Sequence, residues 1–153
     1  MNKTKGIRIS DEEENGIIAV HLPHILVEIN DADSFYWSIL HIYAHEYLRI
    51  DQEFLNLVES INDSPKGISV TWEELNMFSK SFHQIFDTTI IGCKDKNLLH
   101  RYNDDREMHE TCDITIEMID CGYWEVFSKD DQLITKLASK FKDIKFLESD
   151  FEK

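Results

Sequence analysis

The alternation of apolar and polar residues near the end of the chain is the feature that most constrains its fold. Ile114, Ile116 and Met118 are separated by single polar residues, which is the period-two pattern of a strand with one buried face. Residues 120–122 form a short glycine-containing connection, and residues 123–127 are again rich in apolar and aromatic side chains. Two strands joined by so short a connection pair as an antiparallel hairpin. The sequence therefore predicts a β-hairpin at this place.

A helix and a closing strand are predicted to follow the hairpin. Leu133, Leu137 and Phe141 recur at the spacing of one helical face. Acidic residues, Asp130 among them, stand at the start of this segment and lysines stand towards its end, which is the order of charge that the helix dipole favours. Residues 144–147 are expected to form the last strand.

A second helix is predicted from a capping box. Thr71 is followed three residues later by Glu74, so that each side chain can bond to the backbone N–H of the other residue at a helix start. This helix is expected to bury one apolar stripe, made of Leu75, Phe78, Phe82 and Ile85.

The whole chain, residues 1–153, is expected to form a single α+β domain with helices packed on an antiparallel-rich sheet. Residues 94–111 are polar and are predicted to be the longest loop, and long loops are often functional or mobile. The remaining strands are expected at residues 5–9, 35–45, 67–70 and 88–93, with a further helix over residues 50–61.

The charge of the chain excludes two classes of partner. It contains 16 Lys and Arg residues against 30 Asp and Glu residues, a formal net charge of −14. A nucleic-acid-binding protein needs a basic face, and an anionic membrane repels an acidic protein. We therefore expect neither direct nucleic-acid binding nor membrane binding.

The cysteines and the first residues indicate the compartment. Three cysteines are an odd number, which suggests reduced thiols rather than a disulfide framework. The first residues lack the apolar core of a signal peptide, and no stretch of 18 apolar residues exists. A cytoplasmic protein is therefore expected.

Histidines and cysteines raise an alternative, a small metal-dependent regulator or enzyme. His41 and His45 are four residues apart, and His109, Cys112 and Cys121 could supply three ligands. Neither set has the spacing of a known zinc motif, such as H-E-x-x-H or paired C-x-x-C. No phosphate-binding glycine loop or G-x-S-x-G is present. We expect no enzyme activity, no cofactor and no bound metal, and keep the His/Cys protein as the alternative.

Two acidic runs are candidate binding sites. Acidic runs often serve only to solvate a surface, but a polyanionic face also accelerates association with a basic protein. Aromatic residues near such runs are candidate binding hot spots, here Tyr36, Trp37, Tyr43, Tyr47 and Tyr102. The candidate partner-binding residues are Asp11, Glu12, Glu13 and Glu14 in the first run, and Asp104, Asp105, Glu107 and Glu110 with Tyr102 in the second.

Three motifs carry a resemblance to known proteins. They are Lys5-Gly6-Ile7-Arg8-Ile9, then Gly67-x3-Thr71-Trp72-Glu73-Glu74-Leu75, and finally Cys112-Asp113-Ile114-x-Ile116-x3-Asp120-Cys121-Gly122-Tyr123-Trp124-x-Val126-Phe127-x-Lys129-Asp130. With these motifs the chain resembles a family of small, uncharacterised bacterial cytosolic proteins. More broadly, it resembles immunity proteins of bacterial toxin–immunity systems, including contact-dependent growth inhibition.

The resemblance implies a role in binding rather than in catalysis. Immunity proteins are small, acidic and cofactor-free, and each silences a toxin domain. A nuclease toxin has a basic active cleft, so the expected function is to occlude such a cleft with an acidic face. A homodimer is a further expectation, because the strand at residues 35–45 could be an edge that pairs with itself.

Overall fold

The computed structural model describes residues 4–14, 16–46 and 52–149. These residues form a seven-stranded sheet in which all neighbouring strands are antiparallel, together with five α-helices, so the predicted α+β class is confirmed. From one edge to the other the strands are β3 (Ile68–Val70), β2 (Tyr36–Glu46), β4 (Phe82–Cys93), β5 (Ile114–Ile119), β6 (Tyr123–Ser128), β1 (Lys5–Ile9) and β7 (Ile144–Glu148). The helices are α1 (Leu22–Leu26), α2 (Gln52–Asp63), α3 (Trp72–Ser79), α4 (Asp105–Thr111) and α5 (Asp131–Lys140).

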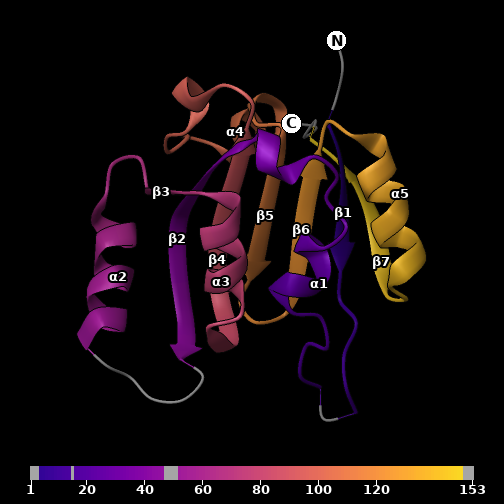
Figure 1. Ribbon diagram of the computed structural model, residues 1–153. Coiled ribbons are helices and arrows are strands. Elements are labelled where there is room, and N and C mark those ends of the chain that lie inside the picture. Colours follow the sequence, from indigo (N-terminus) through magenta and orange to yellow (C-terminus); the bar gives the residue numbers. More distant parts are fainter. Residues whose placement is uncertain (1–3, 15, 47–51, 150–153) are drawn as a thin grey trace.

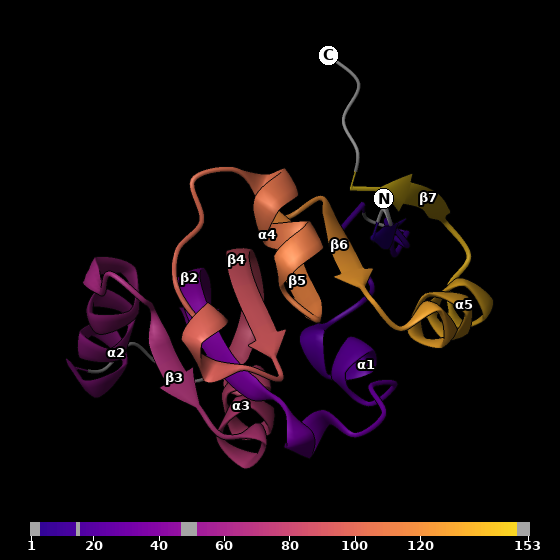
Figure 2. The same ribbon diagram turned by 90° about the horizontal axis from the view of Figure 1, so that it is seen from above.

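The helices are divided unequally between the two faces of the sheet. Figure 2 shows α1, α3 and α5 on one face and α4 on the other, while α2 lies beside β2 and β3. The face under α1, α3 and α5 carries the main core, in which Ile7, Ile90, Ile116 and Val126 are fully buried. On the opposite face α4 lies over one end of the strands (Figure 1). No described helix is long and apolar enough to cross a membrane.

The strongest local signals of the sequence are confirmed. The predicted hairpin pairs β5 with β6 from Ile114 opposite Ser128 to Ile119 opposite Tyr123. The backbone N–H of Glu74 donates to Thr71 Oγ1 at 3.1 Å, and the N–H of Thr71 donates to Glu74 Oε1 at 2.8 Å. Capping boxes and hairpins are set by neighbouring residues, so a sequence can predict them.

The predicted extent of the second helix is wrong. Helix α3 ends at Ser79, and both Phe82 and Ile85 belong to β4. Their spacing of three residues suits a helix, but β4 skips one residue in its register between Phe82 and Gln84 and another between Ile85 and Asp87. A β-bulge adds one residue to a strand, so Phe82 and Ile85 can both be buried although they are three positions apart, a spacing that places them on opposite faces of a regular strand.

The predicted loop at residues 94–111 is also wrong in part. It contains a short 3-10 helix, Lys96–Leu98, and all of α4. Apolar side chains of this segment join residues of β2 and β4 in a second buried cluster. The cluster consists of Leu40, Ile91, Cys93, Leu99, Met108 and Cys112, with Leu98 and Tyr102 packed against it.

The strand predicted at residues 35–45 is present as β2, but it is not an edge. It pairs with β4 along its length and with β3 from Trp37 to Ile39. Beyond β3, the side chain of Asn62 takes the place of a neighbouring strand: its Nδ2 donates to the carbonyl of Ile42, and its Oδ1 accepts the N–H of Ile42, both at 3.0 Å. The predicted self-pairing of this strand therefore has no free edge to use at Ile42.

Candidate functional site

The two acidic runs lie at opposite ends of the sheet. The run at residues 11–14 follows Ile9, whose register partner on β6 is Trp124. The second run precedes β5, whose first residue Ile114 pairs with Ser128 at the other end of β6. Figure 1 accordingly shows the segment after β1 below the sheet and α4 above it. The two runs do not form one continuous acidic face.

The first run lies in a tight turn that we call the acidic hairpin, residues 10–14 and 16–18. Glu12 forms a β-bridge with Ile18, and the N–H of Glu13 donates to the carbonyl of Ile17 at 2.8 Å. The side chains of Glu12, Glu13 and Glu14 are exposed. Within the described part of the chain, these three carboxylates have no hydrogen bond and no ion pair. They project into solvent as three uncompensated charges.

Asp11, by contrast, has a structural role. Its carboxylate accepts the backbone N–H of Lys142 at 3.0 Å and the N–H of Asp143 at 2.8 Å. These bonds hold the acidic hairpin against the connection between α5 and β7. Asp11 is therefore the anchor of the hairpin, and its neighbours carry the available charge.

A groove of about 480 Å³ opens beside the acidic hairpin. Glu13 and Lys80 lie at this groove, and Ile17 is 46% exposed. An exposed apolar side chain flanked by charged ones is the composition of a small protein-binding surface. Its lining residues are Glu13, Ile17, Ile18, His21, Pro23, Ser79, Lys80, Phe82 and Gln84.

Sequence reasoning missed this groove because it unites segments that are far apart in the chain. The hairpin, the start of α1 and the end of α3 meet only in the folded sheet. Phe82 was expected inside a helix, so its position beside the hairpin had no signal in the sequence. Only the run at residues 11–14 indicated this end of the molecule.

The second run is explained by helix formation. Asp104 is the N-cap of α4, and its Oδ1 accepts the N–H of Glu107 at 2.8 Å. Asp105 and Glu107 lie in the first turn, where the helix dipole stabilises negative charge. Glu110 Oε2 accepts the hydroxyl hydrogen of Ser149 at 3.0 Å. Each of these acidic residues thus has a local structural reason.

Tyr102 is held in the fold rather than presented to a partner. Its hydroxyl donates to the carbonyl of Leu98 at 2.7 Å, and its ring packs on the second buried cluster. Burial raises the pKa of this phenol above its usual value. Tyr102 is therefore a poor candidate for a binding hot spot.

The other aromatic candidates differ in exposure. Trp37 is buried in the main core, whereas Tyr36 and Tyr43 are 50% and 63% exposed. Tyr43 packs against Phe86 with ring centroids 5.3 Å apart. Tyr47 lies outside the described residues.

Of the candidate metal ligands, Cys121 is kept apart from Cys112 by the length of a strand. Cys112 precedes β5 and Cys121 follows it, so the strand separates them. His109 is buried, with Nε2 bonded to Glu117 Oε1 at 2.9 Å and its ring stacked on Phe127. Among the described residues, no three His, Cys, Asp or Glu side chains converge on a metal-binding position.

His41, the first residue of the other candidate pair, lies on β2. Its Nε2 is 3.5 Å from Asp87 Oδ1 on β4. The side chain of His45 is outside the described part of the structure.

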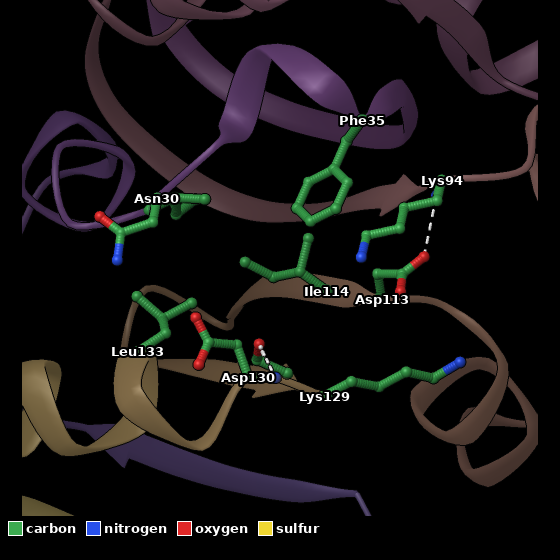
Figure 3. A pocket seen from close by; sticks show the side chains of 10 residues that line it. Asn30, Phe35, Lys94, Asp113, Ile114, Lys129, Asp130 and Leu133 are labelled. Carbon is green, nitrogen blue, oxygen red and sulfur yellow. Dashed lines mark hydrogen bonds between the residues drawn. The ribbon is translucent and has the colours of Figure 1, made fainter.

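A small pocket of about 160 Å³ lies at the α4 end of the sheet (Figure 3). Phe35, Ile114 and Leu133 form its apolar part, and the side chain of Lys94 points towards them. Lys129 points away from the pocket, and its Nζ donates to the carbonyl of Thr111 at 3.1 Å.

Two polar side chains of this pocket, Asp113 and Ser128, are engaged in local structure. The carboxylate of Asp113 accepts the backbone N–H of Lys94 at 2.8 Å. The hydroxyl of Ser128 accepts the N–H of Asp130 at 2.9 Å. No histidine stands among the described residues that line the pocket. The pocket therefore does not present a hydroxyl nucleophile beside a histidine base.

Comparisons of the chain with protein-family models, curated proteins and solved structures found no significant match. The function is therefore argued from the site itself.

Proposed function

We propose that this protein is an immunity protein that binds and neutralises a basic toxin domain of the nuclease class through the acidic hairpin and its groove. One observation carries the proposal. Glu12, Glu13 and Glu14 are exposed without an intramolecular partner among the described residues, and they adjoin a groove with the exposed side chain of Ile17.

The proposed mechanism is stoichiometric binding and involves no catalytic step. A net charge of −14 attracts a basic protein over a range of roughly 8 Å at physiological ionic strength and so accelerates the encounter. Apolar contacts at Ile17 and in the groove then slow dissociation, because desolvated anchors dominate the affinity of such complexes. Occupation of the basic cleft of the toxin would exclude its anionic substrate.

The two acidic runs are not equivalent candidates. The acids of α4 begin a helix, and Glu110 is bonded to Ser149. The three glutamates of the hairpin have no such role within the described structure. The proposal therefore assigns the hairpin as the binding site and α4 as the matched comparison.

Co-expression tests the role. A toxin domain encoded next to this gene should arrest growth when expressed alone, and co-expression of this protein should restore growth. The proposed pair is refuted if the protein is folded and abundant but growth remains arrested.

Charge reversal tests the site. Glu12→Lys, Glu13→Lys and Glu14→Lys together should lower the association rate with that toxin on the order of 100-fold at low salt. The charge-matched comparison uses two reversals at each site: Asp105→Lys with Glu107→Lys, which leaves the N-cap Asp104 in place, should lower the rate far less than Glu13→Lys with Glu14→Lys. Equal losses in both variants would contradict the assignment to the hairpin, while retaining the immunity role.

Metal analysis tests the alternative class of function. Stoichiometric zinc in the purified protein, lost in His41→Ala or Cys112→Ala variants, would favour the His/Cys metal-dependent protein over an immunity protein.

A further inference from the structure

Two of the three cysteines lie side by side where α4 meets the sheet. Cys93 is the last residue of β4, and Cys112 is the C-cap of α4, two residues before β5. Gly92 pairs with Ile114 in the β4–β5 ladder, which brings the two cysteines to the same end of neighbouring strands. Both side chains belong to the second buried cluster, at 0% and 1% exposure.

The two thiols share one buried cluster at the end of the β4–β5 ladder. Their interaction lowers the pKa of Cys93 and, together with burial, raises the pKa of Cys112. Tyr102 packs against the same cluster, with its hydroxyl bonded to the carbonyl of Leu98. Cys93 is thus the better nucleophile of the pair, because the thiolate is the reactive form.

We propose that Cys93 and Cys112 form a reversible disulfide by exchange with a small disulfide such as glutathione disulfide, and that this bond fastens the segment 94–111 to the sheet. In the first step the thiolate of Cys93 attacks one sulfur of glutathione disulfide. A mixed disulfide forms, and one glutathione thiolate leaves and takes up a proton. In the second step Cys112 loses its proton and attacks the sulfur of Cys93, which releases the second glutathione. Two electrons and two protons pass from the pair to glutathione.

Because both cysteines are buried, their reaction with glutathione disulfide depends on local opening of segment 94–111. Neither sulfur is accessible to glutathione while α4 covers the sheet. The first step therefore requires that segment 94–111 lifts from the second cluster, in a local opening of the kind that hydrogen exchange detects. The bond, once formed, closes this segment into a covalent loop and restricts the unfolded chain.

Cys121 provides an internal reference. It lies between β5 and β6, is partly exposed, and belongs to neither buried cluster. It should form only a mixed disulfide with glutathione. Cys121→Ser leaves the buried pair as the only thiols of the chain.

The test uses the Cys121→Ser protein in glutathione buffers of increasing oxidised-to-reduced ratio, followed by acid quenching and mass spectrometry of peptides. The expected product is a Cys93–Cys112 cross-link that reduced glutathione reverses. The cross-linked protein should melt roughly 5–10 °C above the reduced form, because the bond removes conformational entropy from the unfolded chain. A second Cys93→Ser substitution should abolish the cross-link.

Limited trypsin digestion gives an independent readout. Cleavage after Arg101 or Arg106, both between the two cysteines, should leave the oxidised chain as one band without reductant and as two fragments with reductant.

Two outcomes would overturn the proposal. One is the absence of the cross-link after segment 94–111 has been opened with urea below the unfolding midpoint. The other is a cross-linked protein that melts below the reduced form, which would show that the native positions of the two sulfurs do not suit a disulfide.

Discussion

The acidic hairpin and the start of α4 have similar sequences of charge but different physical roles. In α4 the acids cap the helix, occupy its first turn or bond to Ser149. Among the described acids of the hairpin, only Asp11 has a bonded carboxylate, which accepts the N–H groups of Lys142 and Asp143. In an acidic run, only the carboxylates that neither cap a helix nor bond to the backbone are candidates for binding a partner.

The largest expected effect on stability is at Asp11. Asp11→Ala removes a carboxylate that accepts two backbone N–H groups, and we expect a loss of about 2 kcal/mol in the free energy of unfolding, since bonds to charged groups are worth more than neutral ones. Urea unfolding measures this loss. Asp11→Asn keeps one acceptor oxygen and should lose about half as much. No loss in Asp11→Ala would remove the anchor role.

A smaller effect is expected at the N-cap of α4. Asp104→Ala removes the acceptor for the N–H of Glu107 and should cost about 1 kcal/mol, the usual value for an N-cap. Asp104→Ser retains an acceptor and should be nearly neutral. Equal melting temperatures of the Asp104→Ala and Asp104→Ser variants would contradict the capping role of Asp104.

The three hairpin glutamates should contribute little to stability. Replacement of Glu12, Glu13 and Glu14 by Gln should change the free energy of unfolding by less than about 0.5 kcal/mol, as expected for exposed residues without partners. Urea unfolding should show a much smaller loss of stability in this variant than in Asp11→Ala, because only the carboxylate of Asp11 supports the fold. A clear destabilisation would show that these glutamates support the fold, against the proposed assignment.

The smallest effect is a pH dependence at the hairpin end of the molecule. Burial, followed by the charges of His21 and Lys140, lowers the pKa of His24 below its usual 6.5. The Nδ1 of His24 accepts the N–H of His21 at 3.0 Å, a bond that needs the neutral ring. The contribution is therefore complete above pH 6.5 and declines as the pH falls through the folded pKa.

Thermal unfolding between pH 7.5 and pH 5 measures this decline. We expect a small fall in melting temperature that is reduced in His24→Gln, whose side chain retains an acceptor without titrating. An equal fall in both proteins would assign the pH dependence to other groups.

The fold could be predicted where a pattern depends on neighbours in sequence. The alternation at Ile114–Ile119 gave β5, and Thr71 with Glu74 gave the start of α3. The prediction was wrong at Phe82 and Ile85, because β-bulges in β4 give two buried strand residues the spacing of a helical face. It also failed at α4, whose seven residues are mostly polar and bury only Met108 and His109.

The candidate site could be predicted only in part. The exposed glutamates were visible as a run of charge, but Asp11 looked identical to them until Lys142 and Asp143 were placed beside it. Tyr102 was chosen for its acidic neighbours and proved to be packed on the second buried cluster. Such contacts join residues that are distant in the chain, and sequence patterns report mainly on local neighbours.

The position of β1 between β6 and β7 determines the order in which this protein can fold. The first strand of the chain has both of its partners among the last, so Ile7 and Ile9 stay without neighbours until residues 123–148 have been synthesised. At a synthesis rate on the order of 5–20 residues per second, this interval lasts roughly 7–28 seconds. During that time the nascent chain exposes an unpaired apolar strand, and we expect it to engage chaperones that bind such segments. The proposed immunity role would thus depend on the cell's folding machinery as well as on the affinity of the folded protein.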